Sequence, residues 1–192
     1  MAMAKKTRND WRAEHLVELY TEQLGGLENV RRGCEVGVWK GELSWRLLKA
    51  LPHTILHLVD PYQVYDDKYI GTEQERIDRA RELALAAVRP YEEQAIWIPM
   101  ESSLAVETIE DGSLDFVFID ACHSYEFVRQ DIRAWYPKVR AGGIVSGHDY
   151  NGRGDRRGVF GVKRAVDEWA AEIGIDIHVA PQLVWWTKKE EQ

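Results

Sequence analysis

The chain of 192 residues is 45% hydrophobic and carries a formal net charge of −7 at pH 7. This length suits one large domain with a substantial core, and the composition argues against global disorder. The negative charge argues against a general binder of nucleic acid or of an anionic membrane surface, so we expect neither partner. No apolar run reaches the roughly 18 residues that a membrane-spanning helix needs.

The chain has two cysteines, Cys34 and Cys122, and both lie in or at the end of predicted strands. A reduced cytoplasmic protein is the simplest interpretation of so few cysteines. The N-terminal residues carry no apolar core of the kind that a secretory signal has.

The first half of the chain predicts helices and strands in alternation. A helix over about 10–24 places Leu16, Tyr20 and Leu24 on one face. After it we expect strands over about 33–38, 54–60 and 95–98, and helices over about 43–51, 72–88 and 103–108.

The second half continues the alternation and ends with a pair of strands. Residues 114–120 form the clearest strand, because they are apolar almost throughout, as a central parallel strand should be. The later elements expected are a helix over about 124–136, a strand over 144–147, a helix over 160–173 and strands over 175–180 and 183–187. The last two strands are too close for a crossover helix, so they must pair antiparallel. The pattern predicts a doubly wound α/β fold with a Rossmann-like, mostly parallel seven-stranded sheet and a C-terminal antiparallel hairpin.

The stretch Glu35-Val-Gly37-Val-Trp-Lys-Gly41 joins the first strand to its helix. Gly37 and Gly41 permit a tight turn and a close approach of the backbone to a ligand at the strand end. The spacing Glu-x-Gly-x-x-x-Gly differs from the Gly-x-Gly-x-x-Gly of dinucleotide-binding folds. The alternative is a simple turn between strand and helix, without a ligand.

Asp60 stands at the end of the second predicted strand. Its two carboxylate oxygens could accept hydrogen bonds from both hydroxyls of a ribose. This arrangement also fits a dinucleotide site, so it does not separate the two kinds of cofactor. The alternative is an exposed aspartate that caps a turn.

These motifs together resemble the class I S-adenosylmethionine-dependent methyltransferases, over about residues 30–187. The likeness rests on the glycine stretch, on Val59-Asp60, on Asp115-Phe-Val-Phe-Ile-Asp120 and on the closing hairpin. Two further stretches, 119–125 and 142–150, are similar to a branch of small, metal-assisted O-methyltransferase-like proteins with a methyltransferase-24-like domain. The resemblance implies one methyltransferase domain over 1–192, with a donor-binding half at about 30–120 and an acceptor and lid region at about 121–160.

The resemblance also implies which residues bind the methyl donor. Glu35 would lie near the donor's amino-acid end, and Glu101 and Ser102 would lie near its adenine. For Ser102 the alternative is a helix N-cap. The expected donor-binding residues are Glu35, Gly37, Val38, Gly41, Asp60, Glu101, Ser102 and Asp120.

Two carboxylates end neighbouring predicted strands, Asp120 after the fourth and Asp149 after the fifth. Together they suit Mg²⁺ or another divalent cation, and such a metal would lower the pKa of a bound hydroxyl. His148 is a candidate third ligand, and it would favour a transition metal. The alternative has Asp120 holding the donor's ammonium group while Asp149 caps a loop.

His123 follows Asp120 by three residues, where a helix should begin. As a general base it would remove the acceptor's proton. The alternative is a histidine that caps or packs against the helix. We therefore take His123, Asp120 and Asp149 as the candidate catalytic residues.

The polar loop over 150–158 is the candidate acceptor lid, and its arginines could bind a carboxylate or phosphate. We accordingly expect a small-molecule acceptor that carries negative charge. Tyr62, Tyr65 and Tyr69 are candidates for the opposite wall. The lid arginines are Arg153, Arg156 and Arg157.

Trp185 and Trp186 are adjacent in the last predicted strand, so they face opposite sides of the sheet. One of them must then leave the core. An exposed aromatic side chain on an edge hairpin is typical of a subunit contact, which predicts a homodimer.

The function that we expect is S-adenosylmethionine-dependent methylation of a hydroxyl oxygen on a small molecule. One alternative is an NAD-type oxidoreductase, although the third close glycine is missing and the terminal hairpin is foreign to that fold. Another is a non-catalytic nucleotide-binding or scaffold protein, against which the four residues Asp120, His123, His148 and Asp149 argue. A third is a nucleic-acid methyltransferase that uses the arginine loop.

Overall fold

The computed structural model describes residues 6–64, 73–151 and 161–190 of the chain. Its strands are β1 (Arg32–Val36), β2 (Ile55–Val59), β3 (Ala95–Ile98), β4 (Leu114–Ile119), β5 (Val139–Gly147), β6 (His178–Ala180) and β7 (Val184–Lys188). Its α-helices are α1 (Arg8–Gln23), α2 (Ser44–Ala50), α3 (Gln74–Val88), α4 (Ser102–Ala105), α5 (Tyr125–Trp135) and α6 (Val162–Ile173). Short 3-10 turns lie at Leu27–Asn29, Arg89–Gln94, Val106–Thr108, Tyr136–Lys138 and Pro181–Leu183.

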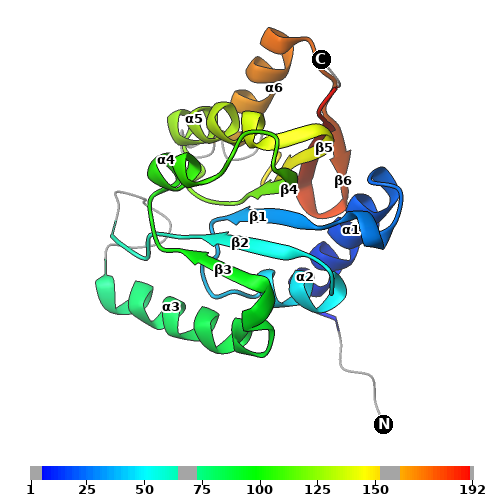
Figure 1. Ribbon diagram of the computed structural model, residues 1–192. Helices are drawn as coiled ribbons and strands as arrows, with labels where there is room; N and C mark the ends of the chain where they lie inside the picture. Colours follow the sequence, from blue (N-terminus) through cyan, green and yellow to red (C-terminus); the bar gives the residue numbers. More distant parts are fainter. Residues whose placement is uncertain (1–5, 65–72, 152–160, 191–192) are drawn as a thin grey trace.

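The strands form one sheet in the order β3-β2-β1-β4-β5-β7-β6, drawn across the centre of Figure 1. Strands β1 to β5 run parallel, whereas β7 pairs antiparallel with both β5 and β6. This confirms the Rossmann-like seven-stranded sheet and its antiparallel C-terminal hairpin. Because the order reverses direction at β1 and β4, the carboxyl ends of these two strands border the crevice where ligands bind in such folds.

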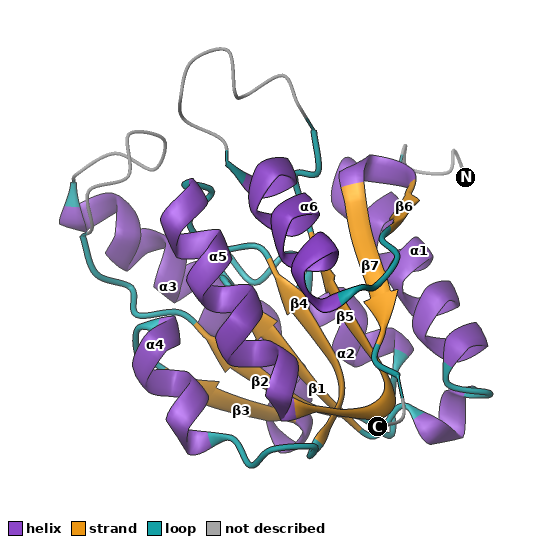
Figure 2. Cartoon of the chain, turned by 90° about the horizontal axis from the view of Figure 1, so that it is seen from above, coloured by secondary structure: helices purple, strands orange, loops and turns teal. Residues whose placement is uncertain are grey.

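Helices cover both faces of the sheet, and a separate hydrophobic core lies on each side (Figure 2). Helices α1, α2 and α3 pack on one face, while α4, α5 and α6 pack on the other. Along α5, Val128, Ile132 and Trp135 recur at helical spacing and are buried against the sheet. In the described part of the chain, no helix combines the length and the apolar character needed to span a bilayer.

Strand β5 begins five residues earlier than expected, at Val139 instead of residue 144. It therefore includes Gly142 and Gly143, which the sequence suggested as a turn. The reason is close strand contact, because a Cβ on Gly143 would lie 2.7 Å from the carbonyl oxygen of Asp115 in β4. These glycines permit an irregularity in the β4–β5 pairing instead of ending the strand.

The tandem tryptophans of β7 do face opposite sides, but neither is exposed as we expected. Trp185 is buried and packs edge-on against Trp169 of α6. Trp186 is partly buried, packs against the core beneath α1 and stacks on the ring of His178 at 4.4 Å between centroids. The prediction of an exposed aromatic was wrong because the short strand β6 supplies a partner ring, and the homodimer stays a prediction without this support.

Helix α1 is fastened to the middle of the sheet by the buried side chain of Tyr20. Its hydroxyl lies 2.8 Å from the Ser146 hydroxyl, which in turn donates to the carbonyl oxygen of Val117. The Tyr20 ring stacks on Phe116 at 4.0 Å between centroids. This contact holds the C-terminal end of α1 against the sheet, while the first turns of the helix, which carry Asn9 and Arg12, border the crevice.

Gly33 in β1 leaves room for the ring of Phe116 on β4, since an added Cβ would lie 2.1 Å from that ring. We therefore expect Gly33→Ala to lower the free energy of unfolding by about 2–3 kcal/mol through overpacking. Urea unfolding would measure the loss. The control is Gly112→Ala, where open space leaves only the strain of a positive φ, about 1 kcal/mol. Equal losses in both variants would contradict the steric explanation.

Candidate active site

A cavity of about 630 Å³ opens at the carboxyl ends of β1, β2 and β4, between α1 and α5. Its volume lies in the range of small-molecule sites, about 300–1,000 Å³. It gathers most of the residues predicted from the sequence, which lie far apart in the chain. The predicted residues that line it are Glu35, Gly37, Val38, Asp60, Tyr62, Glu101, Ser102, Asp120 and His123.

The glycine turn after β1 lies directly against the end of β4. Gly37 has φ +96°, and a Cβ there would lie 2.2 Å from the carbonyl oxygen of Asp120. The backbone N–H of Asp120 donates to Val36, and that of Gly37 donates to Val59. Only glycine fits this position, so the turn holds the donor-side residues and Asp120 at a fixed separation.

Gly41 is not among the residues that line the cavity, although its neighbours Lys40 and Glu42 are, and its approach to a ligand stays a prediction. Its φ is +68°, and a Cβ there would lie 2.9 Å from the Cα of Ala84 in α3. The small residue is needed because the chain passes close to α3 before it enters α2. Gly41 therefore has a packing role in this structure.

Asp60 lines the cavity, where its carboxylate also holds the glycine turn. Its Oδ2 accepts hydrogen bonds from the backbone N–H groups of Val38 (3.1 Å) and Trp39 (2.8 Å). Its Oδ1 accepts from Tyr62 N–H at 2.9 Å. Burial raises the pKa of Asp60, and these three N–H groups oppose that rise. Asp60 thus caps the turn, as the alternative predicted, but it is partly buried and not exposed. The ribose contact stays a prediction, and Oδ1 can still accept a further hydrogen bond.

The hydroxyl of Ser102 is committed to other side chains. It donates to Oδ1 of Asp131 at 2.5 Å and accepts from the indole N–H of Trp135 at 2.8 Å. It makes no N-cap hydrogen bond in α4, so that alternative is not what the structure has. Glu101 is exposed at the rim. Adenine contact by these two residues remains a prediction.

Asp131 is a cavity-lining residue that sequence analysis missed. It is 6% exposed, and burial raises the pKa of its carboxyl to about 6 while the Ser102 hydrogen bond acts the other way. The available signal was its position between Val128 and Ile132 on the apolar face of α5, where a carboxylate is unexpected.

Two acids and two histidines meet at the ends of β4 and β5. The carboxylate of Asp149 lies 2.9 Å from Nε2 of His123 and 3.1 Å from Nδ1 of His148. The same two ring nitrogens lie 3.7 and 3.6 Å from Oδ1 of Asp120. The sequence predicted that these four residues share one site, and the structure brings them together.

The protonation states of these two acids and two histidines depend on one another. Burial alone would lower the pKa of His123 and of His148, but the carboxylates of Asp120 and Asp149 raise each to about 9. Burial would raise the pKa of both carboxyls, yet the two imidazoles hold each well below its usual range. At neutral pH the ligand-free cluster therefore contains two carboxylates and two imidazolium rings. His123 can act as a general base only after it has lost its own proton.

A fifth charged group comes from α1. Nη1 of Arg12 lies 2.8 Å from Oδ2 of Asp120, and both side chains are largely buried. Sequence analysis missed Arg12. The available signal was its place four residues before Leu16, on the inward face of a helix that precedes the sheet.

A family model described as a methyltransferase domain matches residues 34–150, which run from the glycine turn to the end of the acid–histidine cluster. The chain belongs to the methyltransferase-domain family. This confirms the resemblance drawn from the sequence motifs.

Solved structures share the fold of this methyltransferase-domain protein at low sequence identity. A Corynebacterium glutamicum protein superposes with a TM-score of 0.65 at 16% identity, covering 99% of this chain and 93% of its own. A candidate caffeoyl-CoA O-methyltransferase from Staphylococcus aureus gives 0.65 at 16% identity, with 98% and 85% covered. A Podospora anserina methyltransferase bound to S-adenosylhomocysteine gives 0.60 at 11% identity, with 97% and 89% covered. No curated protein matches the chain.

Three side chains of this methyltransferase-domain protein offer ligand atoms that suit a divalent cation. Asp120, His123 and Asp149 each offer one ligand atom, and these atoms lie within 4.8 Å of one another. Two carboxylate oxygens and one imidazole nitrogen suit a divalent metal. His148, the predicted third ligand, lies beside the same carboxylates, but this group contains His123 in its place. Since both rings carry protons without metal, binding would release a proton.

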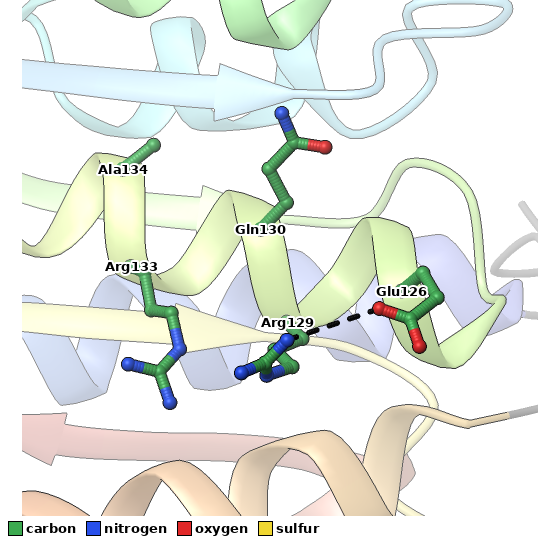
Figure 3. Close-up of a pocket in the computed structure, with 5 residues that line it drawn as sticks. All are labelled: Glu126, Arg129, Gln130, Arg133 and Ala134. Atoms are coloured by element: carbon green, nitrogen blue, oxygen red, sulfur yellow. Dashed lines mark ion pairs between the residues drawn. The ribbon is translucent and has the colours of Figure 1, made fainter.

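A second hollow on the outer side of α5 has a different character (Figure 3). Its lining is confined to that helix: Glu126, Arg129, Gln130, Arg133 and Ala134. The figure draws Gln130 on the opposite side of the helix from Arg129 and Arg133, and a dashed line joins Arg129 to Glu126. Because Arg133 also pairs with Glu172 of α6, the charges of this hollow are compensated.

Several predicted residues lie outside the described part of the chain: Tyr65, Tyr69, Arg153, Arg156 and Arg157. Tyr62 is described and 7% exposed, and its hydroxyl donates to the carbonyl oxygen of Trp39 at 3.0 Å. It therefore supports the glycine turn from within the cavity wall.

The raised pKa of Asp131 gives a testable dependence of stability on pH. The folded protein releases this proton near pH 6 and the unfolded chain near 3.8, so the wild type loses stability as pH rises between these values. Asp131→Asn has no such loss, and its amide oxygen can still accept from Ser102. We expect the difference in unfolding free energy between this variant and the wild type to shift by roughly 2–3 kcal/mol in favour of the variant from pH 4 to pH 7.

Urea unfolding at several pH values would measure this difference. Asp111→Asn is the matched control, because Asp111 is exposed and pairs only with Lys138 among the described residues. A difference between Asp131→Asn and wild type that stays constant with pH would contradict the assignment.

Proposed function

We propose that this chain is a class I S-adenosylmethionine-dependent methyltransferase that methylates a hydroxyl oxygen of a small, anionic molecule. The observation that carries the proposal is the single cavity at the carboxyl ends of β1, β2 and β4. It joins the glycine turn, which suits a nucleoside cofactor, to Asp120 and His123, which suit proton transfer from an acceptor. The family match and the O-methyltransferase name of one structural neighbour support it.

The residues at the donor end fit a cationic cofactor. Glu35 is 2% exposed, and its Oε2 has no hydrogen-bond partner among the described residues. A buried acceptor left unused in a cavity is costly, so it favours a ligand that donates or carries positive charge. Gly37 lets the turn pack against the end of β4, which keeps Glu35 and Asp120 in one cavity. When bound, S-adenosylmethionine supplies an electrophilic methyl group on a sulfonium.

In this proposal the residues of the chain align the acceptor hydroxyl with the methyl group and remove the proton of that hydroxyl. Asp60 holds the glycine turn, and the acid–histidine cluster holds the acceptor end at a fixed distance from it. Fixing the nucleophile against the methyl group lowers the barrier by removing the entropy of encounter. His123, positioned by Asp149, would take up the acceptor's proton once it is itself deprotonated.

A divalent cation fits the same cluster, and with the cation bound His123 would be a ligand and not the general base. Asp120, His123 and Asp149 would hold it, with His148 beside them. The metal would lower the pKa of an acceptor hydroxyl, so that the alkoxide or phenolate forms near neutral pH.

The alternatives have less support. An NAD-type oxidoreductase is disfavoured by the family match and by the single glycine, Gly37, that contacts the cavity. A non-catalytic scaffold would have no need of two carboxylates and two imidazoles gathered in one largely buried cluster, given what burial of charge costs. A nucleic-acid methyltransferase is disfavoured by the net charge of −7.

We also infer a cytoplasmic location. Neither Cys34 nor Cys122 forms a disulfide in the described part of the chain. This fits a reducing compartment.

Titration calorimetry with S-adenosylmethionine, S-adenosylhomocysteine and NAD tests the proposed donor. We expect micromolar binding of the first two and none of NAD. Asp60→Asn should weaken S-adenosylhomocysteine at least about 10-fold, because it removes an acceptor from the ribose and loosens the turn. Asp111→Asn, on an exposed turn before β4, should leave binding unchanged. Binding of NAD alone would end the proposal.

The metal is tested separately with Asp149→Asn. Asparagine tolerates the left-handed backbone of this position, φ +58°, while it removes the charge. We expect S-adenosylhomocysteine to bind within about 2-fold of wild type, since Asp149 does not line the cavity. A rise in melting temperature with Mn²⁺ or Mg²⁺ should appear in wild type and vanish in the variant. An unchanged rise in the variant would exclude Asp149 as a ligand.

A further inference from the structure

Arg12 has more hydrogen-bonding capacity than its ion pair uses. Its guanidinium lines the cavity from α1 and is 16% exposed. A guanidinium has five N–H donors. Among the described residues, Nη1 donates to Asp120, and Nε is buried without a hydrogen-bond partner. Buried donors left unused are costly, which indicates a second acceptor in the bound state.

Glu35, in the same cavity, has an acceptor oxygen that no donor uses. Its carboxylate is buried at the end of β1, and Oε2 has no partner among the described residues. Burial raises the pKa of Glu35 to about 8, and the nearby charge of Arg12 acts against that rise. The two groups are therefore close enough to interact, but no hydrogen bond joins them.

Arg12 and Glu35 thus bring to one cavity a guanidinium with an unused N–H donor and a carboxyl group with an unused oxygen, which a nearby ammonium group would hold in its ionised form. A ligand that satisfies both carries a carboxylate and an ammonium group a few bonds apart, which is the α-amino-acid end of the proposed donor. We propose that Arg12 binds the carboxylate of that amino-acid end while Glu35 faces its ammonium, so that α1 is part of the donor site. This inference rests on the proposed function.

Arg12 is not required merely to neutralise Asp120. That carboxylate already has the imidazoles of His123 and His148 within 3.7 Å. With Arg12 and the donor both present, the Asp120–Arg12 pair would lie beside an ammonium–carboxylate pair. Opposite charges would then alternate around the space, which stabilises all four.

The position of Arg12 is fixed before any ligand binds. Thr7 and Asp10 form a capping box at the start of α1, and Asp10 also accepts from Nε of Arg46 in α2 at 2.6 Å. Further along the helix, Tyr20 is bound to Ser146. A pre-positioned guanidinium loses little side-chain entropy on binding, which favours affinity.

The test compares two ligands on two proteins by titration calorimetry. S-adenosylhomocysteine carries the amino-acid end, whereas 5′-methylthioadenosine has the same adenosine and thioether without it. We expect Arg12→Gln to weaken S-adenosylhomocysteine by about 10- to 100-fold, the range for a lost charged hydrogen bond. Its affinity for 5′-methylthioadenosine should stay within about 2-fold of wild type.

Matched variants sharpen the result. Arg129→Gln removes the same charge from the outer face of α5 and should change neither affinity. Arg12→Lys should recover part of the lost affinity, because it keeps the charge but not the planar fork. Glu35→Gln should also weaken S-adenosylhomocysteine selectively.

Two outcomes overturn the inference and leave the proposed function standing. One is an Arg12→Gln variant that binds S-adenosylhomocysteine as wild type does. The other is a variant that loses both ligands equally, which would mean that Arg12 only supports the fold around Asp120. A wild-type chain that binds neither S-adenosylhomocysteine nor S-adenosylmethionine overturns the proposed function, and the inference with it.

Discussion

The contact between Gly37 and the backbone of Asp120 is the constraint on which the site depends. A Cβ at Gly37 would lie 2.2 Å from the Asp120 carbonyl oxygen, so β1 can end this close to β4 only with glycine there. The contact fixes Glu35, which precedes the turn, at one side of the cavity and the acid–histidine cluster at the other. The proposed donor and acceptor regions are therefore separated by a distance that the sheet itself sets, and such orientation is what catalysis of the proposed reaction requires.

Charge compensation is the second feature of the site. Asp120 is surrounded by Arg12, His123 and His148, and Asp149 contacts both imidazoles. Buried charges persist because each has an opposite partner, and removal of one partner leaves an uncompensated charge. A divalent metal must therefore enter this cluster by exchange with an existing partner or a bound proton. The acids and bases of the site are therefore already joined to one another in a network of ion pairs, and they are not free side chains that wait for a ligand.

The differences between expectation and structure have a common cause. Gly41 was read as a ligand contact, and in the structure its φ of +68° serves the close approach to Ala84. Ser102 does not cap α4, because its hydroxyl is shared between Asp131 and Trp135. In both cases the residue type indicated a special local role, but the sequence did not reveal the contacting residue. That residue belongs to a helix that is distant in the sequence. Local sequence patterns do not reveal which distant residue a glycine or a serine hydroxyl contacts.

The sequence by itself determined the alternation of strands and helices, the antiparallel hairpin and the acids at strand ends, since hydrophobic period and turn residues are local properties. It also placed Asp120, His123, His148 and Asp149 in one site, because parallel strands end at one edge of a sheet. Only the tertiary structure decided that Arg12 and Asp131 join the cavity. Helix α1 reaches it through the Tyr20–Ser146 contact, and α5 reaches it by packing across the sheet. Both placements depend on long-range packing, which no periodicity within a single segment encodes.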